Sequence, residues 1–291
     1  MMRWQRGRER LIEGAIWVCG ISSIAIVALI FVFLLKEGFA LFRVVSVGAF
    51  LWGRHWYPIS EPPQFGVLPL ILGSCWVTAG AVILSVPLGI ASALFISEIA
   101  KGWAKEALKT GIELLAAIPS VVLGFIGVTV LAPLIKQVFH LPTGLTALTG
   151  SITLAFMAMP TIVSITEDAL TALPRGYREA ALALGATRWQ MMNRVLLRAA
   201  GSGIVAAVML GIGRVIGETM AVMMVTGNAA VIPRSLLHPV RTMTATIAAE
   251  MGETVRGSDH YFALFAIGIV LFVISFAINV VADLFLHRER T

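Results

Sequence analysis

The chain has 291 residues, of which 58% are hydrophobic and only 13% are charged. Its mean hydropathy of +0.90 excludes an ordinary soluble domain, in which charged residues make up about a quarter of the chain. We therefore expect an all-α integral membrane protein. The net charge of +6 does not predict a nucleic-acid partner, because the cytoplasmic loops of a membrane protein carry the same excess of Lys and Arg.

Long apolar runs predict six transmembrane helices. The first extends from about Gly14 to Leu35, follows four arginines, and is long enough to cross a bilayer at roughly 20 residues per crossing. It is too long for the apolar core of a signal peptide, so we expect a retained span. The other five spans are expected at about Val67–Ile96, Leu114–Ile135, Gly144–Thr166, Ala199–Thr226 and Tyr261–Leu286.

The positions of the basic residues predict the orientation of these spans. Residues 1–66 are expected to form a cytoplasmic tail, the first span and an external segment, and residues 67–291 the core of the protein. Fourteen of the 22 Lys and Arg residues then fall in segments expected inside and seven in segments expected outside, while Arg214 lies within a span. This twofold bias predicts that both termini are cytoplasmic.

Two external segments are expected. The first, Lys36–Gln64, carries aromatic residues whose rings suit the headgroup zone of a membrane. These residues are Trp52, Trp56 and Tyr57. The second is Asn228–His260, in which Thr242–Met251 has the spacing of an amphipathic helix that either lies at the membrane surface or dips inward.

Three prolines are candidate hinges or kinks of the spans. Pro87 lies within the second span, Pro119 opens the third, and Pro160 lies in the inner half of the fourth. A proline removes one helical N–H, which a span tolerates where neighbouring helices or water satisfy the freed carbonyl. Simple helix curvature is an equally good interpretation of Pro160.

The most polar long stretch between two spans is Leu173–Ala200, which carries five arginines. Its first half predicts a short helix, because four residues recur at positions i, i+3, i+4 and i+7. These residues are Tyr177, Ala180, Ala181 and Leu184. Gly185 suits the positive φ that often ends a helix, and Thr187 and Gln190 have the spacing of a capping box that opens a second helix.

The expected fifth span contains two charges, Arg214 and Glu218, which would share one helix face because they are four residues apart. Gly211, Gly217 and Ala221 would lie on the same side. One charge at mid-bilayer costs at least ~2.5–3.5 kcal/mol, so two interpretations remain. The pair either locks the helix to its neighbours, or forms an anion site or gate in which Glu218 positions the guanidinium for oxyanion oxygens.

The sequence offers no machinery of its own for ATP hydrolysis or metal binding. It contains no Gly-Lys pair and therefore no phosphate-binding P-loop. Cys19 and Cys75 lie in apolar runs without the spacing of a disulfide framework or a metal site, and we expect them to be small buried hydrophobes.

The polar loop resembles the EAA loop of type I ABC-importer permeases. Glu179–Ala181 reads Glu-Ala-Ala, and Gly185 follows six positions after the Glu. The resemblance implies a type I ABC-importer permease fold in which the coupling loop, about residues 173–200, docks into a separate ATPase. The residues that it places at the docking site are Tyr177, Glu179, Ala180, Ala181 and Gly185. The loop departs from the family's pattern at Arg198, where a proline is usual.

Three further stretches resemble the PstC family of phosphate-permease subunits, namely Ile118–Phe125, Ile165–Leu170 and Gly213–Asn228. The resemblance covers about Val67 to Leu286 and implies a heteromeric importer of inorganic phosphate in a bacterial or archaeal cytoplasmic (inner) membrane. It implies a PstA-like second permease subunit, a PstB-like ATPase dimer that holds ATP and Mg, and a PstS-like phosphate-binding protein. The chain itself would need no cofactor. By the same resemblance, Arg214 and Glu218 would line the phosphate route.

Other functions remain open at this stage. Importers of sulfate, molybdate and phosphonate also use an EAA loop, and arginine chemistry alone selects an oxyanion without specifying which. An ion-coupled secondary transporter could use the same buried charges as a relay, although no convincing inverted repeat is present. A membrane enzyme is disfavoured, because all five histidines lie in expected loops or at a span end.

Overall fold

A computed structural model of the protein describes residues 2–288, with side chains over residues 12–281. The long helices are α1 (Met2–Ala40), α3 (Leu68–Leu94), α4 (Trp103–Ala117), α7 (Ala147–Thr171), α11 (Gly201–Gly217) and α14 (Asp259–Arg288). The shorter ones are α2 (Val47–Trp52), α5 (Ser120–Ile126), α6 (Ala132–Val138), α8 (Arg175–Ala183), α9 (Arg188–Gln190), α10 (Leu197–Ala199), α12 (Met220–Val225) and α13 (Met243–Glu250).

Short segments of other geometry connect these helices. One is a 3₁₀ turn, η1 (Leu41–Arg43). Three are π-helical: η2 (Phe95–Ile99), η3 (Gly127–Leu131) and η4 (Met191–Leu196). A small hairpin pairs β1 (Trp56–Tyr57) with β2 (Gln64–Phe65), antiparallel. Segments η2 and η4 adjoin the polar loop. Because π-helical turns concentrate at functional sites, both are candidate parts of such a site.

Five helical stretches of the described chain are long and apolar enough to cross a membrane. They are Ile12–Arg43, Leu68–Ile99, Ser120–Val138, Ala147–Thr171 and Asp259–Val281. A sixth results if Arg188–Ala199 and Gly201–Gly217, which meet at a bend of 74°, are counted as one span. The prediction of an all-α membrane protein with about six spans is therefore confirmed.

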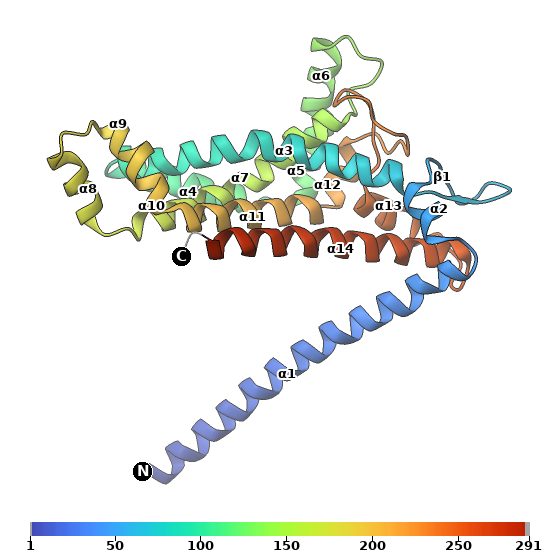
Figure 1. The fold of residues 1–291 in the computed structure, drawn as a ribbon, viewed down its shortest axis with the longest axis horizontal. Coiled ribbons are helices and arrows are strands. Elements are labelled where there is room, and N and C mark those ends of the chain that lie inside the picture. The colour runs from blue at the N-terminus through green and yellow to red at the C-terminus, as the bar shows by residue number, and fades with distance from the viewer. Residues whose placement is uncertain (1, 289–291) are drawn as a thin grey trace.

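Helices α3, α7, α11 and α14 lie side by side along one axis (Figure 1). Helices α8 and α9 lie at one end of this bundle, α13 and the β-hairpin lie at the other, and α6 projects from its side. Helix α1 packs on α14 and leaves the bundle at an angle, so most of its side chains are exposed in this chain. The polar coupling loop and the segment that contains α13 thus occupy opposite ends of the molecule.

The centre of the bundle is the seam between α3 and α7, where small residues let the two backbones approach closely. A Cβ atom added at Gly80 would lie 2.4 Å from Ser151 Oγ, and one added at Gly89 would lie 2.7 Å from Ile162 Cγ2. Ser151 Oγ also donates a hydrogen bond to the Val77 carbonyl (3.1 Å). Dispersion contacts and this interhelical hydrogen bond hold the seam, because lipid supplies little hydrophobic driving force between spans.

Replacing Gly80 by leucine is expected to force α3 away from α7 and to lower the melting temperature of the purified protein. Overpacking of this kind costs about 1–3 kcal/mol, and here even the first added carbon collides. Gly111→Leu is the matched control, because nothing lies within 4 Å of a Cβ at that glycine of α4. Equal melting temperatures for the two variants would contradict the proposed seam.

Two boundaries differ from the sequence prediction. The first helix continues past Leu35 to Ala40, because no proline or glycine cap ends it at Leu35. The third span begins at Ser120, since Pro119 adopts an extended conformation (ψ 140°) that separates it from the preceding amphipathic helix α4. The expectation of buried cysteines is also wrong within this chain, where Cys19 and Cys75 are both exposed.

Candidate functional site

The polar loop folds as helix, turn and helix, as its sequence predicts. Pro174 stands immediately before α8 rather than in its first turn, and Gly185 follows the helix with φ +81°. Thr187 and Gln190 form the predicted capping box: Thr187 Oγ1 accepts from the Gln190 N–H (3.2 Å), and Gln190 Oε1 accepts from the Thr187 N–H (2.9 Å). These local bonds fix the direction in which the second helix leaves the turn.

The outer face of α8 carries an open apolar hollow of about 440 Å³. Its lining contains all four residues of the predicted helix face and is made by Pro174, Gly176, Tyr177, Ala180, Ala181, Leu184 and Val195. Tyr177 is 48% exposed and Leu184 is 89% exposed. Apolar side chains gathered on one exposed face are typical of a contact site for another protein.

The inner face of α8 is attached to the bundle. Ala181 is buried and packs in a cluster that includes Ile96 of η2 and Leu170 of α7. Beside it, Arg178 donates from Nη2 to Glu98 Oε1 (2.7 Å) and from Nε to both carboxylate oxygens (3.2 Å each). Of the predicted docking residues, Tyr177, Glu179, Ala180 and Gly185 are exposed, whereas Ala181, which also lines the hollow, is buried.

The structure corrects the predicted arrangement of Arg214 and Glu218. The stretch that contains them is not one helix: α11 ends at Gly217, Glu218 is extended (φ −70°, ψ 133°), and α12 begins at Met220. The two side chains therefore do not share a helix face, and no ion pair joins them within the described part of the chain. The prediction fails because the apolar sequence continues through the break without a proline.

Arg214 lies in the last turn of α11, and its side chain is exposed in this chain. It is thirteen residues after Gly201, or ~20 Å along the helix, in a stretch that together with Arg188–Ala199 is apolar enough to cross a membrane. Gly211, expected on the same face, is instead buried against Ile162 of α7. Because a charge in contact with lipid is costly, the Arg214 face must meet another subunit or a water-filled path.

Glu218 stabilises the break in the span. Its Oε1 accepts a hydrogen bond from the Ala221 N–H at the start of α12 (3.2 Å), and its carbonyl oxygen accepts from Thr244 Oγ1 of α13 (2.8 Å). Unwound backbone at membrane depth persists only where protein or water satisfies its polar groups. Helix α13 therefore does more than lie at the surface: its residues Met243–Thr246 are buried, and they hold the broken segment from the far end of the bundle.

The three candidate hinge prolines occupy different settings. Pro87 lies inside α3 and Pro160 inside α7, and both helices continue through them. Pro119 instead marks the boundary between α4 and α5. The role of all three as hinges stays a prediction.

A polar cluster closes the end of the bundle that contains α13. Glu250 accepts from Trp56 Nε1 (3.1 Å), pairs with Arg241 Nη1 and contacts His260 Nε2 (2.8 Å). Trp56 is therefore buried in the protein core, in contrast to the headgroup position expected from its sequence, whereas Trp52 and Tyr57 are exposed and their headgroup position stays a prediction. Glu250 joins the β-hairpin, the segment before α13 and the start of α14.

Replacing Glu250 by alanine is expected to destabilise this end of the bundle by about 2–3 kcal/mol, because the indole N–H and the guanidinium of Arg241 would lose their acceptor in a partly buried site. The melting temperature of the purified protein measures this loss. Glu253→Ala is the control, since the Glu253 side chain is exposed and makes no described hydrogen bond or ion pair. Equal effects of the two substitutions would contradict a structural role for Glu250.

A second charged cluster lies near the opposite end. Glu167 of α7 accepts from Lys109 Nζ of α4 (2.9 Å) and lies 3.5 Å from Lys105 Nζ. The hydrogen bond to Glu167 raises the pKa of Lys109 above its usual value. Because the pKa of Lys109 is raised in the folded state, this lysine contributes its stability fully at neutral pH, and that contribution is lost when strongly alkaline conditions deprotonate it.

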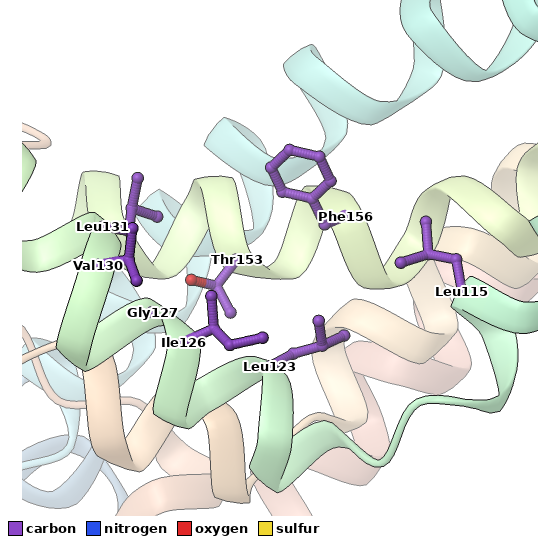
Figure 2. Close-up of a pocket in the computed structure, with 8 residues that line it drawn as sticks. All are labelled: Leu115, Leu123, Ile126, Gly127, Val130, Leu131, Thr153 and Phe156. Carbon is purple, nitrogen blue, oxygen red and sulfur yellow. The ribbon is translucent and has the colours of Figure 1, made fainter.

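An apolar hollow of about 280 Å³ opens between α5, η3 and α7, with Leu115 of α4 at one end (Figure 2). Figure 2 shows that Thr153 is the one lining side chain with a polar atom, and its hydroxyl already donates to the Thr149 carbonyl (2.8 Å). This hollow therefore offers no free hydrogen-bond donor to an anion, whereas the exposed guanidinium of Arg214 does.

Comparison with known families matches residues 85–291 to the family described as the inner membrane component of binding-protein-dependent transport systems. Among curated relatives, the chain is 45% identical over 271 residues to the probable ABC transporter permease protein YqgH of Bacillus subtilis, covering 92% of this chain and 87% of the relative. It is 39% identical to the phosphate transport system permease protein PstC of Mesorhizobium japonicum, with 82% of this chain and 78% of the relative covered.

Solved structures support the same fold. A bacterial alginate ABC transporter in complex with a pentasaccharide-bound periplasmic protein matches with a TM-score of 0.63 at 16% identity, covering 91% of this chain and 92% of that one. The MetNI methionine ABC transporter, in an inward-facing conformation, matches with a TM-score of 0.59 at 19% identity over 79% of this chain and 99% of that one. By sequence and fold, the chain belongs to the family of inner-membrane permease components of binding-protein-dependent ABC transport systems, together with the PstC phosphate permeases.

Proposed function

We propose that this protein is the permease subunit of an ATP-driven importer and forms part of the pathway for inorganic phosphate across the inner membrane. The observation that carries the proposal is the course of α11, which starts at the end of the coupling loop and ends at Arg214 and the break at Glu218. A single helix thus connects a surface suited to an ATPase with a guanidinium suited to an oxyanion.

The proposal includes three kinds of partner. An ATPase dimer that holds ATP and Mg would bind the apolar hollow of α8, which Tyr177 and Leu184 line. A second permease subunit would cover the Arg214 face and leave a water-filled route beside it. A phosphate-binding protein would deliver the anion at the end that contains α13, which would then be the external end. Both termini and the coupling loop would be cytoplasmic.

Reconstitution tests this function. The chain would be co-expressed with its partner subunits, purified and placed in liposomes, and uptake of labelled phosphate would be followed with and without ATP on the ATPase side, in the presence of the binding protein. We expect uptake that requires ATP and is unaffected by excess sulfate.

The other outcomes discriminate between the alternatives. Uptake blocked by sulfate would retain the ATP-driven architecture and change the substrate to another oxyanion. Uptake that does not require ATP would indicate an ion-coupled transporter. It would leave the exposed apolar face of α8 without a functional explanation. The PstC relatives favour phosphate over sulfate, because they are named phosphate permeases and align over most of this chain.

A further inference from the structure

We propose that Arg178 is a positioning residue that joins the coupling helix α8 to α3 through Glu98, so that α3 acts as a connecting rod between the ATPase side and α13 at the opposite end. The inference rests on the proposed function and adds to it a route for the motion. Its basis is a pair of polar attachments at the two ends of one continuous span, Leu68–Ile99.

The first attachment lies at the cytoplasmic end. The Arg178 guanidinium binds both oxygens of Glu98 and also donates to the carbonyls of Leu173 (3.1 Å, from Nη1) and Leu170 (2.9 Å, from Nη2). Glu98 sits in η2, the last turn of the span, and its side chain is only 8% exposed. A two-pronged ion pair of this kind fixes orientation as well as distance, which a single-point lysine contact would not.

The guanidinium of Arg178 is charged throughout the physiological pH range, as in any arginine, and the hydrogen bond to Glu98 raises its pKa further. Ala181, one turn further along α8, packs in the same cluster as Ile96 of η2. Charge and packing therefore attach the inner face of α8 to the end of α3, while its outer face stays free for an ATPase.

The second attachment lies at the other end of the span. Ser74 Oγ of α3 accepts from the N–H of Met243, the first residue of α13 (3.0 Å). A Cβ at the neighbouring Gly73 would lie 2.4 Å from the Arg241 carbonyl, so the backbone before α13 rests directly on α3. Thr244, the next residue of α13, holds the carbonyl of Glu218 at the break in the phosphate route.

These contacts form a continuous path from α8 through η2 and α3 to α13 and Glu218. Between its ends, α3 is one continuous helix that packs along α7 at the small-residue seam and passes through Pro87 without a break, so it can transmit a displacement from one end to the other. Coupling between distant sites requires such a chain of packed elements with defined contacts at each junction. Movement of α8 towards or away from the bundle would thus shift α13 and change access to the Arg214 face.

The test uses the whole reconstituted complex with three readouts: phosphate uptake, ATP hydrolysis and the reactivity of a cysteine placed after α13. For the third readout, Glu253→Cys is introduced in a chain whose own cysteines are replaced (Cys19→Ser and Cys75→Ser), and its labelling rate is compared between the nucleotide-free and ATP-trapped complexes. We expect Arg178→Gln to assemble, to keep hydrolysing ATP, and to lower phosphate moved per ATP by roughly tenfold, as expected when a coupling energy between sites is lost.

In the Arg178→Gln complex, the labelling rate at position 253 should no longer respond to nucleotide. Glu98→Gln removes the charge from the other side of the pair and should give the same loss of response, which keeps the test decisive if one variant assembles poorly. Glu167→Gln is the matched control, because it removes a buried carboxylate from an ion pair near the same end without touching the junction of α8 and α3. It should lower stability but keep phosphate moved per ATP within about twofold of the parent.

Two results would overturn the inference. One is a labelling rate that still depends on nucleotide in both Arg178→Gln and Glu98→Gln. The other is an equal loss of coupling in Glu167→Gln, which would mean that the Arg178–Glu98 pair contributes only to the stability of the fold. Failure of the proposed function is a separate outcome, because it would appear as a lack of ATP-dependent phosphate uptake in the parent complex. The labelling response to nucleotide does not depend on which solute is carried.

Discussion

Replacing Arg214 by alanine is expected to lower phosphate uptake by the reconstituted complex by at least roughly tenfold while leaving its assembly intact. A charge-assisted hydrogen bond contributes about 1.5–3 kcal/mol, so its loss at a point that the anion must pass slows transport by roughly ten- to a hundredfold. The side chain is exposed and makes no hydrogen bond or ion pair within the described residues, so its removal leaves no buried partner unsatisfied in this chain.

Two controls separate charge from geometry at this position. Arg214→Lys keeps the positive charge but loses the planar fork, and we expect intermediate uptake with weaker discrimination between oxyanions. Arg234→Ala removes an exposed arginine from the external segment and should leave uptake near that of the parent. Unchanged uptake by Arg214→Ala would show that the residue only helps to lock α11 to a neighbouring subunit.

The coupling loop could be predicted from the sequence because its structure is determined locally. The helix face of α8, the positive φ of Gly185 and the capping box of Thr187 and Gln190 all depend on residues within a few positions of one another. Short-range backbone and capping preferences decide such features with little influence from the rest of the chain. The apolar runs predicted the spans for a similar reason, since length and hydropathy are properties of one segment.

The break at Glu218 could not be predicted in the same way. Residues 211–225 keep the hydropathy of a span, and neither proline nor a pair of glycines marks the position. The unwound backbone is stabilised by the local bond from the Ala221 N–H to Glu218 Oε1 and by a hydroxyl 26 residues away, that of Thr244, which the local sequence does not specify. The nearest signal in the sequence is Gly217, directly before Glu218, because glycine has a low helix propensity. The higher helix propensity of its neighbours outweighs this signal, so the sequence predicts a continuous helix.

The long-range polar contacts that attach the helices to one another could not be predicted for the same physical reason. Arg178 and Glu98 are 80 residues apart, and Trp56 and Glu250 are 194 residues apart. In the sequence, Glu98 is an acid at the end of an apolar run, and Glu250 is an acid in an external segment. Each of these positions is compatible with many hydrogen-bonding partners. Only the packing of α3 against α7 and of α13 against α14 brings these groups together.

The second large effect is expected at the outer face of α8, where Ala180→Trp should uncouple transport from ATP hydrolysis. Ala180 lines the open hollow beside Tyr177 and Leu184, so an indole would fill the space that an ATPase surface must enter. Overpacking a well-fitted contact costs about 1–3 kcal/mol, and we expect phosphate uptake to fall at least roughly tenfold while the chain remains folded in the membrane.

The same helix supplies the control for this substitution. Ala183 is also an exposed alanine of α8 but does not line the hollow, so Ala183→Trp adds the same side chain with the same loss of helix propensity outside the contact. Co-purification of the ATPase, phosphate uptake and ATP hydrolysis would be measured for both variants. Glu179→Lys reverses an exposed charge on the same helix, in the polar pocket beside Arg178, and we expect it to lower uptake as well. Normal uptake in Ala180→Trp and Glu179→Lys would exclude this face as the ATPase contact, because neither an added ring nor a reversed charge can be accommodated without cost in a closely packed interface.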